Sequence, residues 1–123
     1  MSKLASFLTC LFALLYASLA VAQGSPEGVA LSNDEATSFI KGKRLTAVRV
    51  AGGNPSLQFR DDGTMYGNNA GSSDSGKWRI EDGKLCMAWR NWEYEGCGKL
   101  MRVGQEIHHL YASGTATHLI FKP

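Results

Sequence analysis

The sequence predicts an all-β fold with one short N-terminal helix. After Gly42, turn residues separate eight short apolar or alternating segments, roughly one every ten residues, which is typical of a small antiparallel meander, barrel or sandwich. The length of 123 residues is a second observation. It suffices for one domain but excludes a (β/α) barrel and a doubly wound nucleotide fold with a substrate domain.

The first 22 residues have the pattern of a secretory signal peptide. Lys3 gives a positive start, residues 4–20 are uncharged and apolar or small, and Ala-Val-Ala at 20–22 is typical of a cleavage site. The apolar stretch is near the lower length limit for a membrane-spanning helix and contains small polar residues, so a cleaved leader is favoured over an anchor. We therefore expect a periplasmic or secreted protein without a membrane span after cleavage.

A single folded domain, residues 31–123, is expected to follow a flexible lead-in at 23–30 that is rich in Gly, Ser and Pro. The leader removes only Lys3 of the 13 basic residues, so 12 basic against 11 acidic residues leave a net charge of +1. This balance gives no sign of nucleic-acid binding, which needs a basic surface. A monomer is compatible with the sequence.

The helix is predicted over 33–41. Ser32 and Glu35 have the spacing of a capping box, in which each side chain binds the backbone N–H of the other residue. An apolar stripe follows, and Gly42 is a natural end for the helix.

The eight predicted strands are bounded by turn residues. They cover 45–51, 56–60, 65–68, 77–80, 84–89, 96–102, 107–112 and 117–122. Residues 67–76, rich in Gly, Asn and Ser, are expected to form the loosest loop. A closed barrel and an open sandwich fit this spacing nearly equally. In a barrel we expect a filled interior, because a chain this short buries too little surface to support a large cavity.

Three hairpins can be given a register. Asp-Gly pairs at 62–63 and 82–83 predict two-residue turns. Cys10 is removed with the predicted leader, which leaves Cys86 and Cys97, an even number of cysteines in an exported chain. A disulfide is therefore predicted between them, and it fixes the third hairpin around residues 90–93. Closing this ring of about 12 residues stabilises the fold by roughly 2–3 kcal/mol. The cross-strand pairs that follow are Phe59–Tyr66, Trp78–Met87, Ile80–Leu85 and Trp89–Tyr94.

One segment of the sequence carries a family resemblance. It comprises Cys97 and residues 76–89, which read Gly-Lys-Trp-Arg-Ile-Glu-Asp-Gly-Lys-Leu-Cys-Met-Ala-Trp. They resemble a pattern in an uncharacterised family of small exported bacterial β-rich proteins, a domain of unknown function. Residues 59–67 fit the same pattern. The resemblance implies a lipocalin-like or avidin-like architecture and an envelope location in a bacterium. It supplies no catalytic residues.

No catalytic, cofactor or metal site is predicted. The chain has no Gly-x-Ser-x-Gly elbow and no phosphate-binding loop, and its adjacent acidic pairs at 61–62 and 81–82 fall in turn signals. His109 and His118 are expected on one face, where two imidazoles could bind a transition metal. No third ligand is evident beside them, so we predict a protein that is not an enzyme and holds no metal.

The main functional candidate is the loop of Arg90, Asn91, Trp92, Glu93 and Tyr94. An exposed Trp92 framed by charged and amide side chains is typical of an interaction hot spot. We expect an exported, non-enzymatic protein that recognises a protein or an envelope component, as an inhibitor or immunity protein does. The other interpretation of Trp92 is that it folds back over the barrel end.

The alternative function is a lipocalin-like carrier of a small apolar ligand. Aromatic side chains pointing into an open barrel would form its binding face. The candidates for that face are Trp78, Trp89 and Phe59, with Tyr94 beside them.

Overall fold

The computed structural model of the protein describes residues 28–122. The predicted leader, residues 23–27 of the predicted lead-in and residue 123 lie outside the described residues. The elements are β1 (Val29–Ala30), α1 (Asn33–Ile40), β2 (Arg44–Arg49), β3 (Ser56–Phe59), β4 (Thr64–Asn69), β5 (Ser72–Glu81), β6 (Lys84–Trp89), β7 (Glu95–Val103), β8 (Glu106–Leu110) and β9 (Thr117–Phe121).

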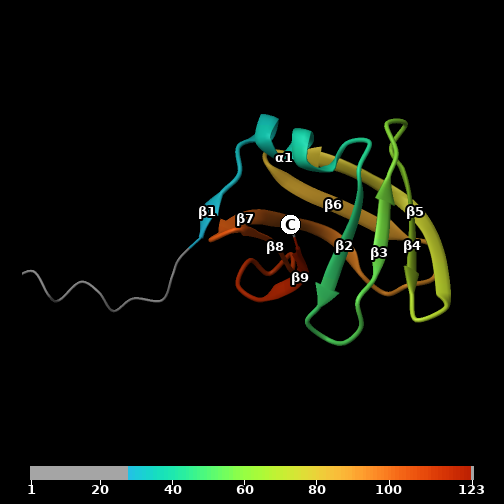
Figure 1. The fold of residues 1–123 in the computed structure, drawn as a ribbon. Coiled ribbons are helices and arrows are strands. Elements are labelled where there is room, and N and C mark those ends of the chain that lie inside the picture. The colour runs from blue at the N-terminus through green and yellow to red at the C-terminus, as the bar shows by residue number, and fades with distance from the viewer. Residues whose placement is uncertain (1–27, 123) are drawn as a thin grey trace, which may run out of the picture.

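Strands β2 to β9 form one closed antiparallel barrel (Figure 1). Each strand pairs with the next along the chain, and β9 returns to pair with β2, which makes an up-and-down meander of eight strands. Closure leaves these strands without an open edge. The predicted all-β class, the single helix and the eight strands are confirmed, and the barrel is found instead of the open sandwich.

The helix α1 covers one end of the barrel, the upper end in Figure 1. Its capping box is confirmed: Ser32 Oγ accepts a hydrogen bond from the backbone N–H of Glu35 at 3.1 Å, and Glu35 Oε1 accepts one from that of Ser32 at 2.9 Å. Ile40 is fully buried. The ring of Phe39 packs edge-on against Phe121 of β9, with centroids 5.5 Å apart. This end of the barrel is therefore closed by apolar packing.

A two-residue strand, β1, adds to the outside of the barrel. Val29 and Ala30, at the end of the predicted lead-in, pair with Arg102 and Met101 of β7. The N–H of Leu31 then donates to Leu100 O at 2.9 Å. A strand of two residues carries too little alternation to be seen in the sequence.

The predicted loop at 67–76 is wrong. Strand β4 extends to Asn69 and β5 begins at Ser72, so only a two-residue turn remains between them. Ala70 and Gly71 have φ values of 55° and 87°, the positive values that a type I′ hairpin turn requires. Pairing of residues 67–69 with residues 72–74 across this turn overrides the weak β propensity of Gly, Asn, Ser and Asp.

The hairpin between β3 and β4 differs from its prediction by one residue. Phe59 pairs with Met65, and Tyr66 pairs with Gln58. The N–H of Arg60 donates to Thr64 O at 2.9 Å, so the loop itself has three residues, 61–63. It places Gly63 at a φ of 88°, which is the second common hairpin geometry. Met65 is therefore in the core, while Tyr66 lies outside the barrel with 43% of its surface exposed.

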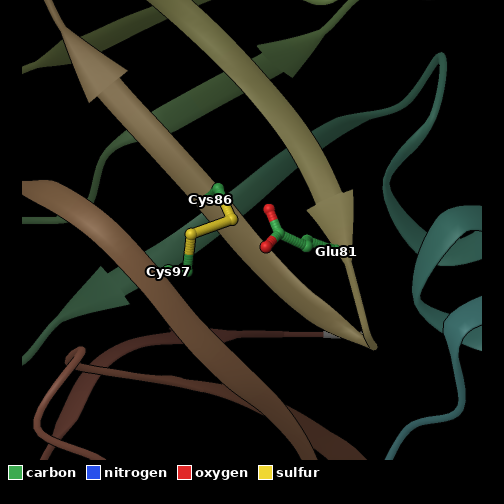
Figure 2. A group of neighbouring side chains, drawn as sticks. All are labelled: Glu81, Cys86 and Cys97. Carbon is green, nitrogen blue, oxygen red and sulfur yellow. A yellow bond between two sulfur atoms is a disulfide. The ribbon is translucent and has the colours of Figure 1, made fainter.

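The next two hairpins are confirmed. Trp78 pairs with Met87, and Ile80 with Leu85, across the turn at 82–83. Cys86 pairs with Cys97, and the disulfide joins β6 to β7, as Figure 2 shows.

The core fills the helix-covered half of the barrel. Phe59, Phe121, Met65, Leu85 and Leu100 are essentially inaccessible to solvent. The ring centroids of Phe59 and Phe121 lie 6.5 Å apart. The other half is not filled, which corrects the prediction of a wholly filled interior.

Candidate ligand-binding site

The open end of the barrel contains a cavity of about 910 Å³. Its lining comes from the four connections opposite the helix (β2–β3, β4–β5, β6–β7 and β8–β9) and from the parts of the strands beside them. The first two of these turns lie at the lower end of the barrel in Figure 1. The aromatic and larger apolar side chains of the lining are Trp89, Trp92, Tyr94, Tyr111, His118, Leu57 and Leu119. Cavities of this size and composition are typical of small-molecule sites.

Two indoles form one wall of the cavity. The rings of Trp89 and Trp92 pack together with centroids 4.7 Å apart. They lie over Gly67 of β4, where a Cβ atom would come within 2.6 Å of Trp92 Cζ3 and 2.8 Å of Trp89 Cη2. The missing side chain of Gly67 therefore makes the space that the indoles occupy. Trp92 is partly buried in this wall, which agrees with the interpretation that it folds back over the barrel end and not with the one that leaves it exposed.

Asp74 of β5 holds the loop that carries Trp92. Its side chain points into the barrel, and only 7% of the residue surface is exposed. Oδ2 accepts the backbone N–H groups of Asn91 at 2.8 Å and Trp92 at 2.7 Å, and Oδ1 accepts Asn91 Nδ2 at 3.2 Å. Burial raises the pKa of Asp74, but the hydrogen bonds from Trp92 and Asn91 outweigh burial and leave that pKa lowered. The carboxylate is therefore charged at neutral pH.

A pair of buried histidines lies between the core and the cavity. Nδ1 of His109, on β8, is 3.1 Å from Nδ1 of His118, on β9. Nε2 of His109 is 3.2 Å from Leu85 O. The predicted placement of the two imidazoles on one face is confirmed. The register shifts between His109 and Leu110, and this irregularity leaves both His118 and Leu119 buried.

Both imidazoles are neutral at physiological pH. Burial, with a smaller contribution from His118, lowers the pKa of His109 to about 3. Burial, with a smaller contribution from the positive charge of Arg49, lowers the pKa of His118 to about 4. Groups with these pKa values are poor proton carriers near pH 7.

Tyr94 and Tyr111 extend the aromatic lining around His118. The ring of Tyr94 stacks on the imidazole of His118, with centroids 4.1 Å apart and planes inclined by 10°. The ring centroids of Tyr111 and His118 are 4.9 Å apart. The hydroxyl of Tyr94 is buried without a hydrogen-bond partner among residues 28–122. Burial, with a smaller contribution from Tyr111, raises the pKa of Tyr94 to about 12.

The formal charges of the lining belong to residues at the rim. Arg49, Glu93 and Glu95 are exposed, whereas the more deeply placed aromatic residues are uncharged. The cavity thus combines a neutral aromatic interior with a mixed charged entrance.

The sequence-predicted residues divide between the two halves of the barrel. Trp89 and Tyr94 line the cavity, as do Asn91, Trp92 and Glu93 of the candidate loop, while Arg90 does not. Phe59 and Trp78 lie in the filled half instead. Their rings pack edge-on with centroids 6.0 Å apart, and Trp78 Nε1 donates a hydrogen bond to Arg60 O at 2.8 Å.

Sequence reasoning missed three residues of this region. Asp74 fell inside the predicted loop at 67–76, so its inward direction could not be seen. Tyr111 and Leu57 were placed on strands without a role. The only signal for Tyr111 in the sequence was that an aromatic residue stands near the end of the predicted strand 107–112.

A second group of potential ligand atoms lies on the outside of the barrel. Glu81, Cys86 and Cys97 place their oxygen and sulfur atoms within 4.8 Å of one another (Figure 2). Both sulfurs belong to the disulfide and offer no thiolate, the form that binds metals. Glu81 is paired with Arg79 at 2.9 Å. This cluster is therefore structural.

Comparisons with known proteins give no further assignment. No family model, curated protein or solved structure matches the chain. The resemblance to an uncharacterised family stays a prediction. Within residues 28–122, no helix is long and apolar enough to cross a membrane. The disulfide suggests an oxidising compartment.

Proposed function

We propose that the protein binds one small, largely apolar molecule at the open end of its barrel. The observation that supports this function is the cavity of about 910 Å³ with its lining of aromatic rings. Eight-stranded barrels have room for one small ligand, and cavities of this kind are the usual place for one. This function corresponds to the carrier alternative that the sequence left open.

The structure of the walls supports binding without a large rearrangement. The two indoles pack on each other over Gly67, and Asp74 fixes the backbone of the loop that presents Trp92. A site whose side chains are already held in place loses less conformational entropy when a ligand enters.

Binding is a better description of this site than catalysis. The two buried histidines beside the aromatic interior, His109 and His118, have pKa values of about 3 and about 4, and burial raises the pKa of Tyr94 to about 12. A general base works best when its pKa is near the operating pH. A neutral imidazole held in a hydrogen bond serves as a fixed polar contact for a ligand.

Recognition of a protein partner through loop 90–94 has weaker support. That hypothesis needs an exposed aromatic anchor, but Trp92 packs against Trp89 in the cavity wall. The exposed members of the loop are the polar residues Arg90, Asn91 and Glu93. The same loop is better explained as one wall of a small-molecule site.

The leader pattern and the disulfide together support a location in the periplasm or outside the cell. The disulfide needs an oxidising compartment to persist. In that setting the protein would carry, store or remove a small hydrophobic compound.

Titration with the apolar fluorophore N-phenylnaphthylamine tests the function. We expect saturable binding of one probe per chain. Tyr111→Ala removes a ring from the cavity lining. It should weaken binding by roughly tenfold, because one aromatic contact contributes about that factor to the affinity.

Tyr66→Ala is the matched control, because Tyr66 lies outside the barrel. It should leave the affinity unchanged. Absence of saturable binding, or an equal loss in both variants, would show that the cavity is not a ligand site.

A further inference from the structure

The hydrogen bonds of the buried histidine pair begin at a backbone carbonyl. Leu85 O can only accept a hydrogen bond, and His109 Nε2 lies 3.2 Å from it. Gly98 of β7 lies against this histidine, because a Cβ atom there would collide with Leu110 O and come within 3.0 Å of His109 Nε2. His109 therefore carries its proton on Nε2.

This proton fixes the tautomer of His118. A neutral imidazole with its proton on Nε2 has a lone pair on Nδ1. His109 Nδ1 is thus an acceptor, and the atom 3.1 Å away, His118 Nδ1, must be the donor. With its single proton on Nδ1, His118 has a lone pair on Nε2.

His118 Nε2 is left as an acceptor at the cavity. His118 lines the cavity, and its Nε2 has no hydrogen-bond partner among residues 28–122. The stacked ring of Tyr94 covers one face of the imidazole at 4.1 Å. The lone pair of Nε2 lies in the plane of the imidazole, so a donor in the aromatic interior reaches this nitrogen along the ring edge.

We propose that the cavity selects uncharged aromatic molecules that carry an O–H or N–H group, and that His118 Nε2 accepts their hydrogen bond. The inference rests on the proposed function and names its ligand class. The aromatic lining provides ring contacts, and its formal charges, on Arg49, Glu93 and Glu95, are confined to the exposed rim.

Such a site discriminates strongly between donors and their capped analogues. An aromatic ether fills the same space as the phenol but leaves the acceptor unpaired in a water-poor pocket. Entry of the ether removes water from Nε2 without replacing its hydrogen bond. The penalty of an unpaired buried polar group falls on the ether alone.

The binding test compares β-naphthol with its methyl ether by isothermal titration calorimetry. We expect the native protein to bind β-naphthol at least tenfold more tightly. His118→Phe keeps a ring beside Tyr94 but removes the acceptor, so both compounds should bind with nearly equal affinity. His118→Gln supplies another acceptor and should restore part of the preference.

His108→Phe is the matched control. His108 precedes His109 on β8, and its Nε2 pairs with Glu106 at 3.1 Å and not with His118. This variant should keep the full preference for β-naphthol. Loss of the preference in this variant would contradict the assignment to His118.

Nitrogen NMR of the native protein tests the tautomers without any substitution. We expect the proton of His109 on Nε2 and that of His118 on Nδ1. A proton on His118 Nε2 would overturn the inference, as would equal affinities of the two naphthalenes for the native protein, although the cavity would remain a ligand site. Failure of both naphthalenes to bind would overturn the proposed function and the inference with it.

Discussion

Asp74 and Trp92, 18 residues apart, are joined by a 2.7 Å hydrogen bond from the backbone N–H of Trp92 to Asp74 Oδ2. The bond connects a carboxylate inside the barrel to the loop that forms one wall of the cavity. It explains why an indole in a charged loop turns inward instead of standing exposed.

Asp74→Ala should open this wall. The substitution removes one charged acceptor and leaves two backbone N–H groups without their partner. Hydrogen bonds to charged groups are the stronger kind, so losing this acceptor should clearly lower the midpoint of unfolding in urea. Asp61→Ala, at an exposed position, should cost less than about 0.5 kcal/mol. Equal effects of the two substitutions would contradict the role of Asp74.

Gly67→Ala should displace the indoles. Its Cβ would lie 2.6 Å from Trp92 Cζ3, too close for the present packing. We expect a loss of roughly 1–3 kcal/mol of stability and a red shift of tryptophan emission as Trp92 moves toward water. In a Trp92→Ala background the same substitution should cost less, because only the contact with Trp89 remains. An equal loss of stability in both backgrounds would show that the strain does not come from contact with Trp92.

The sequence predicted the fold well because the barrel depends on local signals. The Asp-Gly turns and the capping box act within a few residues and the two cysteines within 11, and each was found as expected apart from the turn at 62–63. The prediction for that turn was wrong because an Asp-Gly pair fits both two-residue and three-residue connections. The choice between them depends on which of Met65 and Tyr66 the core accepts.

The site was only partly predictable because it depends on contacts between distant strands. Nothing near Asp74 in the sequence indicates that it faces the loop at 91–92. The division of the barrel into a filled and an open half follows from where α1 packs, which alternation along strands does not encode. For this reason Phe59 and Trp89 looked equivalent in the sequence, although only Trp89 reaches the cavity.

Tyr94→Phe should leave the fold intact or make it more stable. The hydroxyl of Tyr94 is buried and has no hydrogen-bond partner in the described part of the chain. An unpaired buried polar group costs about 1–3 kcal/mol, so its removal should raise the unfolding free energy by a similar amount while the stacking on His118 is kept. Thermal unfolding measures this directly. A clear destabilisation would reveal a water molecule or another partner for the hydroxyl in solution.

Acid should destabilise the protein between pH 7 and pH 5 through the two buried histidines. Their pKa values of about 3 and about 4 lie below the usual value of 6.5, so in this range the unfolded chain binds protons that the folded chain does not. Stability is therefore full above the unfolded pKa and falls as the pH drops toward the folded one. We expect a loss of about 2 kcal/mol for each imidazole between pH 7 and pH 5, measured by urea unfolding. The pKa of Asp74 is lowered, so that carboxylate titrates below this window. His118→Phe should remove about half of the pH dependence, and an unchanged slope would mean that His118 is accessible to protons in the folded protein.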